Sequence, residues 1–168
     1  MERVEGSGLF HDDSNEALRY VPRMTPDALT EYLHQHIPLT AALGARALRC
    51  DTYEVEIGAP LKPNLNHRGT AFGGSLATLG IVSGWALLHL LSRREHMPAR
   101  LVIQRSECDF AEPVEDEFAA TSRLTEKEWL HFVATFRRYQ RARITIHTEI
   151  RVRESTAVRH RGTYVALA

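Results

Sequence analysis

The first half of the chain shows two hydrophobic periods in succession. Apolar residues recur every three to four positions over residues 26–37, which predicts a short helix that Pro38 interrupts and that closes near Gly44. Over residues 46–57 apolar and polar residues alternate instead. This alternation predicts a single strand with one buried face.

The central segment, Ser75 to Arg94, is apolar on nearly every side, and the stretch before it, residues 61–74, is rich in proline, asparagine and glycine. A loop is therefore expected to lead into a helix that the rest of the protein covers on most sides. Its longest apolar run, residues 80–91, is shorter than the ~20 residues that a bilayer crossing needs. We expect a buried helix and no membrane partner.

The second half of the chain is mostly strand. Alternation and β-rich composition predict strands, separated by one amphipathic helix and a turn at Gly162, over residues 98–110, 118–124, 144–152 and 164–167, with the helix over 129–139. The order of elements predicts an α+β fold in which a curled antiparallel sheet packs on the central apolar helix.

Composition narrows the class of protein. The 168 residues carry 21 basic and 21 acidic side chains, so no overall field favours nucleic acid or anionic lipid. The two cysteines, Cys50 and Cys108, form no paired motif, and the first ten residues lack the apolar core of a signal peptide, so we expect a cytoplasmic protein. Residues 1–24 are polar and without pattern, which predicts a flexible arm before one domain over residues 25–168.

Candidate chemistry lies where the loop becomes the central helix. Gly73 and Gly74 stand at this boundary, so their backbone N–H groups are among the first, unpaired donors of the helix. Such donors can hold a developing oxyanion, and glycine lets a carbonyl approach the backbone closely. The simpler alternative is that these glycines only permit a tight turn and close packing.

The spacing Asn-x-x-Gly-x-x-His-Gly-Gly of phenylacetyl-CoA-type hotdog thioesterases is similar to Asn66, Gly69, Phe72, Gly73 and Gly74 here. More broadly, residues 63–76, Trp129 and residues 140–144 resemble the thioesterase family related to the C-terminal domain of YiiD, over most of residues 25–168.

This resemblance implies a hotdog fold, without a cofactor, that assembles as a homodimer or dimer of dimers. It also implies an acyl thioester of coenzyme A or acyl carrier protein as substrate, in fatty acid metabolism. Asn66 would orient the attacking water or the substrate, and the Gly73 N–H would polarise the thioester carbonyl. The remaining substrate contacts expected in this segment are Gly69, Thr70, Phe72, Gly74 and Ser75.

The general base is the open question. Many hotdog thioesterases carry an acid on the central helix, whereas residues 73–94 contain none. His67 is one candidate base, although loop histidines are more often solvated. Ser83 lies where the acid might be sought and is either a substrate contact or a helix-packing residue; Asp109 and Glu112 remain as reserve acids.

Four arginines lie at the end of the amphipathic helix or just after it, at positions 137, 138, 141 and 143, and of these Arg141 and Arg143 are expected to bind substrate phosphates. The simpler explanation for all four is a solvated helix end, where cations favourably meet the helix dipole. The nine histidines lack metal-ligand spacing, since His34 and His36 point apart on a helix, so no metal site is expected. The rival functions are a catalytically silent acyl-binding or regulatory domain and, more weakly, a hotdog dehydratase.

Overall fold

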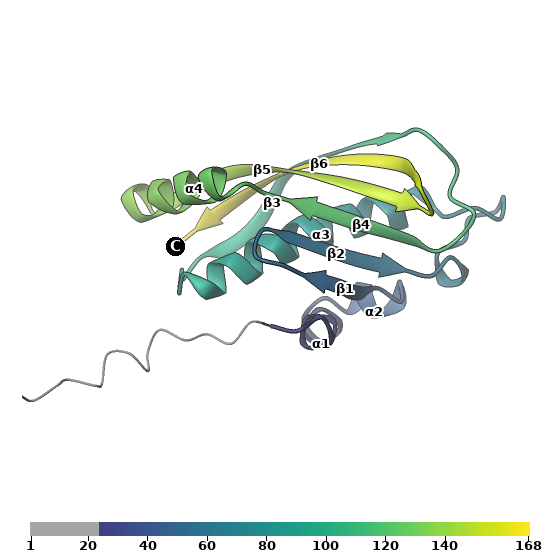
Figure 1. Cartoon of the computed structure of the whole chain (residues 1–168), viewed down its shortest axis with the longest axis horizontal. Coiled ribbons are helices and arrows are strands. Elements are labelled where there is room, and N and C mark those ends of the chain that lie inside the picture. Colours follow the sequence, from purple (N-terminus) through teal and green to yellow (C-terminus); the bar gives the residue numbers. More distant parts are fainter. Residues whose placement is uncertain (1–23) are drawn as a thin grey trace, which may run out of the picture.

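The computed structural model describes residues 24–168. The arm expected at residues 1–24 lies outside the described residues except for Met24, which is partly buried against the core. Figure 1 shows the layers: the long helix α3 (Gly73–Arg94) runs along one face of the sheet, and the shorter helices lie at its margins.

Two short helices open the described chain. Helix α1 (Pro26–His36) begins where the Thr25 side chain accepts a hydrogen bond from the Ala28 N–H at 3.2 Å, and α2 (Pro38–Ala42) follows directly. Gly44 then turns the chain with a φ of 65°. The predicted helix start, break and turn are confirmed.

All six strands form one antiparallel sheet in the order β1-β2-β4-β5-β6-β3. Their bounds are β1 (Arg46–Cys50), β2 (Glu54–Ala59), β3 (Arg100–Phe110), β4 (Phe118–Arg123), β5 (Arg141–Val152) and β6 (Ser155–Leu167). Within residues 24–168 strand β3 pairs only with β6, so its other edge has no strand partner among them.

Two sequence-based interpretations are wrong. Residues 46–57 form a hairpin rather than one strand, because the chain reverses at Asp51, whose N–H donates to the Glu54 carbonyl at 2.8 Å. Gly162 lies inside β6 and not in a turn, since the reversal occurs earlier, at Arg153, which takes a φ of 50°. Neither reversal contains the glycine or proline that usually marks a turn.

Helix α3 is the centre of the core. Its leucines at 76, 79, 87, 88, 90 and 91 are buried, and each contributes about 1.5–3 kcal/mol by leaving water. It packs against β2, β3, β4, β5 and β6. The 22 residues of α3 exceed the apolar run expected from the sequence, and by length and composition they would suffice to cross a membrane. However, 67% of the 18-residue apolar stretch that meets this criterion is buried inside the protein.

Two glycines let α3 approach β6 closely. A Cβ on Gly80 would lie 2.8 Å from Cγ of His160, and one on Gly84 would lie 2.9 Å from Cζ of Tyr164. The buried Tyr164 hydroxyl donates to the Ile81 carbonyl at 2.8 Å. The backbone of α3 is therefore in direct contact with the aromatic rings of β6.

The amphipathic helix α4 (Glu126–Tyr139) is also as expected. Thr125 and Glu128 form a reciprocal capping box at its start. Its buried side, which packs against β5, consists of Trp129, Phe132, Val133 and Phe136.

Candidate active site

The loop before α3 is fixed to the fold by Asn64, which sequence reasoning missed. The Asn64 side chain is buried and its Nδ2 donates to the Leu43 carbonyl at 2.9 Å and to the Pro60 carbonyl at 2.7 Å. The Asn64 backbone carbonyl accepts a hydrogen bond from the Phe72 N–H at 2.7 Å. One residue thus ties the end of α2, the start of the loop and the start of α3 together.

Asn66 shapes the tip of the same loop. Its Oδ1 accepts from the N–H groups of Arg68 (2.8 Å) and Thr70 (3.3 Å). Its Nδ2 donates to Thr70 Oγ1 at 2.8 Å and, more weakly, to the Ala71 carbonyl at 3.4 Å. Gly69 completes the turn with a φ of 82°, a conformation that favours glycine. The Asn66 side chain is thus committed to loop structure.

The start of α3 has no side-chain cap. Phe72 is the N-cap residue, and its carbonyl accepts from the N–H groups of Ser75 (2.9 Å) and Leu76 (3.2 Å). Within residues 24–168 the N–H groups of Gly73 and Gly74 have no hydrogen-bond partner. Two donors at the positive end of a 22-residue helix are therefore open to a ligand.

Apolar side chains surround these donors. Phe72 is 57% exposed and its ring lies over Gly74, where a Cβ would stand 3.0 Å from the ring carbon Cδ1. Phe110, at the end of β3, is 51% exposed and lies 3.6 Å from where a Gly73 Cβ would be. Sequence reasoning missed Phe110, whose only signal is its place as the last apolar residue of its strand. The space beside the Gly73 backbone is therefore open up to Phe110, whereas the Phe72 ring fills the space beside Gly74.

The candidate bases are only partly gathered here. His67 is on the loop and exposed, and Asp109 is exposed beside Phe110. Glu112 accepts a hydrogen bond from the Ser155 hydroxyl at 2.7 Å. No acid of residues 24–168 forms a hydrogen bond or ion pair with the segment from Asn66 to Ser75. Among residues 61–72, His67 is therefore the only candidate general base that the loop itself carries.

Two members of the predicted set are buried. Ser75 lies in the first turn of α3 with its side chain covered. Ser83 is fully buried: its hydroxyl donates to the Ala120 carbonyl at 3.1 Å and accepts from Ser122 at 2.9 Å, and Ser122 in turn bonds Thr148 at 2.7 Å. In the single chain Ser83 joins α3 to β4, which is the packing role.

Arg141 and Arg143 lie far from the loop within one chain. Phe110 is in register with Val158 and, through it, with Ile150 of β5. Arg141 is nine residues away along β5, about 30 Å at ~3.3 Å per residue. These arginines could meet a substrate at Gly73 only across a subunit interface.

The other two arginines of that set have local partners. Arg137 forms an ion pair with Glu95 at 3.1 Å, and the Arg138 guanidinium lies 5.1 Å from the ring centroid of Tyr139. Both contacts are exposed, so they add little stability. In residues 24–168 no group of three or more histidine, cysteine or acidic side chains is placed to hold a metal.

His89 is the titratable group on α3 whose pKa is shifted most. It stacks between Tyr32 (4.6 Å between ring centroids) and Trp85 (4.8 Å), and its Nε2 is buried without a hydrogen-bond partner. Burial lowers the pKa of His89 to about 4. It lies in the C-terminal half of the helix, away from the loop, so it is not a base for chemistry at Gly73.

Comparisons with known proteins agree with this architecture. A protein of unknown function from Chlorobaculum tepidum has a TM-score of 0.79 at 26% identity, over 86% of this chain and 98% of that one. The "putative thioesterase from Shewanella oneidensis" has a TM-score of 0.77 at 20% identity, over 85% and 97%. A thioesterase from Haemophilus influenzae has a TM-score of 0.68 at 14% identity, over 89% and 93%.

The last two identities are low enough that these likenesses show the fold alone, and that fold is the hotdog. The family model described as "Putative thioesterase (yiiD_Cterm)" matches residues 26–168, nearly all of the described chain. The chain therefore belongs to the thioesterase family named for the YiiD C-terminal domain.

Proposed function

We propose that this protein hydrolyses acyl thioesters of coenzyme A or acyl carrier protein at the start of α3. The observation that supports this most is the pair of open N–H donors on Gly73 and Gly74, at an uncapped helix start with apolar side chains around it. Donors placed in this way stabilise the negative oxygen that forms when water attacks a thioester carbonyl. Each is typically worth ~100-fold or more in kcat.

The hydrolysis needs a base and a positioned water. In our proposal His67 takes a proton as the water oxygen bonds to the acyl carbon, and returns it to the sulfur as the carbon–sulfur bond breaks. Asn66 is a positioning residue, since its four hydrogen bonds fix the loop that carries His67. Phe72, with Gly69 and Thr70, forms the entrance that the acyl group meets, and Ser75 lies buried behind it in the first turn of α3.

We also propose a homodimer, or a dimer of dimers, that pairs through β3. This strand has an open edge and two exposed apolar residues, Val102 and Ile103, while Phe72 and Phe110 lie exposed near one end. An unpaired apolar edge favours association, and a two-fold axis would cover it with its own copy. A partner subunit would also be the route by which Asp109, Arg141 or Arg143 meets a site.

One observation favours the alternative of a silent acyl-binding domain. Helix α3 carries no acid from Gly73 to Arg94, so the usual carboxylate base of hotdog thioesterases is absent from it. Such a domain would bind acyl thioesters at the same helix start without cleaving them. Binding and turnover must therefore be measured separately.

The test is a single-turnover assay with acyl-CoA and acyl carrier protein thioesters of graded chain length, paired with equilibrium binding. We expect turnover of at least one substrate, and a loss of ~100-fold or more in Gly73→Val, because Cβ branching blocks approach to the N–H donors. Thr78→Val, one turn along the same helix, is the control. Binding without turnover by the parent protein would favour the silent domain, and neither binding nor turnover would refute both.

A further inference from the structure

A hollow lies on the face of the sheet that is turned away from α3, apart from the candidate active site. Its volume is about 640 Å³, and β1, β2, β4 and the turn between β5 and β6 line it. The lining residues Gly58 and Thr121 alternate along their strands with Ile57 and Ala120, which are buried against the helix. The sheet therefore separates this hollow from the start of α3.

One cross-strand row forms its floor and two of its walls. Arg46 is in register with Gly58, Gly58 with Ala119, and Ala119 with Arg151. Three inter-strand spacings of about 4.8 Å put the two arginine Cα atoms about 14 Å apart. The two middle positions have the smallest side chains, so the row is a trough with a guanidinium group on each side.

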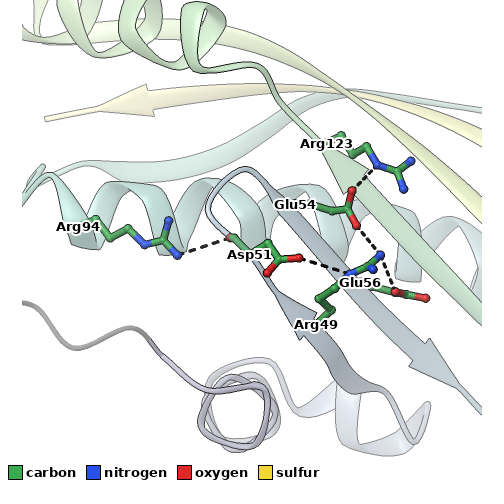
Figure 2. Close-up of polar contacts among 6 residues, drawn as sticks. All are labelled: Arg49, Asp51, Glu54, Glu56, Arg94 and Arg123. Atoms are coloured by element: carbon green, nitrogen blue, oxygen red, sulfur yellow. Dashed lines mark hydrogen bonds and ion pairs between the residues drawn. The ribbon is translucent and has the colours of Figure 1, made fainter.

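Two of the five arginines that line the hollow have their donors taken up by neighbouring acids. Figure 2 shows Arg49 held by Asp51, Glu54 and Glu56, the last at 3.0 Å. At the far end of the hollow Arg153 donates from Nε and Nη2 to Asp116, at 3.2 and 2.9 Å. These guanidinium groups have few donors left for a ligand.

The row itself is different. The Arg46 side chain makes no ion pair or hydrogen bond with any residue from Met24 to Ala168. Arg151 makes only one contact, from Nη2 to the Glu154 carbonyl at 3.3 Å. Arg123, further along the hollow, is anchored through Nε to Glu54, and Figure 2 shows its terminal nitrogens pointing away from that carboxylate. Arg46, Arg123 and Arg151 thus keep free N–H donors. Two of them, Arg123 and Arg151, are already held in place by one hydrogen bond each.

The chemistry of the lining indicates what would bind. The hollow has five arginines against three glutamates: Glu56 is paired with Arg49, while Glu117 and Glu154 lie toward the β5–β6 turn. Arginine donors match phosphate oxygens in pairs. The exposed Leu48 side chain lies over Gly58 and gives the floor an apolar patch. The volume is in the range of small-molecule sites, roughly 300–1,000 Å³.

We propose that this hollow is a second ligand site, which binds a phosphorylated small molecule of nucleotide size between Arg46 and Arg151. The phosphate groups bridge the two guanidinium groups above Ala119, and the flat or apolar part lies on Leu48, which covers Gly58. The site is on the opposite face of the sheet from α3, so its occupancy does not depend on the proposed thioester hydrolysis.

Titration calorimetry and NMR on the full chain test the proposal, with inorganic diphosphate, ADP and free coenzyme A as probes. We expect saturable binding of at least one probe, weakened ~10-fold or more in Arg46→Gln and in Arg151→Gln. Ala119→Met should weaken it as well, because it fills the trough without changing charge. Arg159→Gln, an exposed arginine on β6 outside the hollow, is the control and should bind as the parent does.

The probes also identify the source of the phosphate. Tighter binding of coenzyme A than of ADP would indicate the carrier of a thioester, and equal binding would indicate a separate nucleotide ligand; either supports the site. The proposal is wrong if no probe saturates at millimolar concentration, or if the Arg46→Gln/Arg151→Gln double variant binds like the parent. Equal binding of citrate would refute the phosphate class, and loss in Arg159→Gln to the same extent would show only a diffuse charge effect.

Discussion

Asn66 offers the sharpest test of how the loop works, because its four hydrogen bonds are of unequal quality. Asn66→Ala removes two contacts at 2.8 Å and two at 3.3 and 3.4 Å. At a net 0.5–1.5 kcal/mol for each good hydrogen bond, and with the side chain partly exposed, the loss is about 1–2 kcal/mol. For a domain of this size the melting temperature should fall by roughly 2–8 °C. We expect kcat for thioester hydrolysis to fall ~100-fold or more, since the loop loses its shape.

Asn66→Asp separates loop shape from direct action on the substrate. A carboxylate keeps the acceptor for the Arg68 and Thr70 N–H groups, and the Thr70 hydroxyl can rotate to donate to it. The loop should therefore persist, and kcat should stay within about threefold to tenfold of the parent, because only the long contact to the Ala71 carbonyl is lost. Melting curves and single-turnover rates of both variants, measured on the same thioester, are the assay.

Two results would refute this reasoning. If Asn66→Asp keeps the parent melting temperature but loses as much rate as Asn66→Ala, the amide acts by donating to water or substrate and not through the loop. If Asn66→Ala retains both stability and full turnover, the loop is not the active site.

Three further predictions concern the rest of the molecule. Gly84→Ala should lower the free energy of unfolding by about 1–3 kcal/mol in urea, because the new Cβ would clash with the buried Tyr164 ring. Ile103→Asp should give a 19.0 kDa species by sedimentation where the parent is larger; a parent that already sediments at that mass would contradict pairing through β3. Since burial lowers the pKa of His89 to about 4, below the ordinary histidine value of about 6.5, the unfolded chain binds the proton more readily, and stability should fall as pH drops from 6.5 toward 4. His89→Phe keeps the ring stack and should flatten that dependence in pH-resolved denaturation, leaving the slope that comes from the similarly buried His160; an unchanged slope would contradict the assignment.

The elements that the sequence predicts well have a hydrophobic pattern that stays the same over their whole length. Helix α3 is apolar on all sides and β5 alternates over its whole length, so local pattern and tertiary burial agree. The two errors occur where they disagree. Asp51 turns the chain without a typical turn residue, and Gly162 makes room in β6 for the neighbouring rings of His160 and Tyr164, which would lie 2.9 and 2.7 Å from its Cβ.

The candidate site divides in the same way. The open donors of Gly73 and Gly74 follow from local sequence, because a helix start always leaves its first N–H groups unpaired. Asn64 and Phe110 could not be predicted, since their importance depends on contacts with Leu43 and with the start of α3. The row from Arg46 to Arg151 depends on the register of four strands, which alternation alone does not determine.

The way α3 is attached has a consequence for how such a protein could change its substrate. Its polar links to the sheet, the Ser83 hydroxyl and the Ile81 carbonyl, lie two to three turns inside the helix. The loop before it is held largely by its own asparagines, Asn64 and Asn66. The scaffold and the loop tip are thus attached separately, so grafting a different tip between Leu65 and Ala71, which leaves Asn64 and its contacts in place, should alter which acyl groups are accepted while the helix, the sheet and their mutual orientation persist.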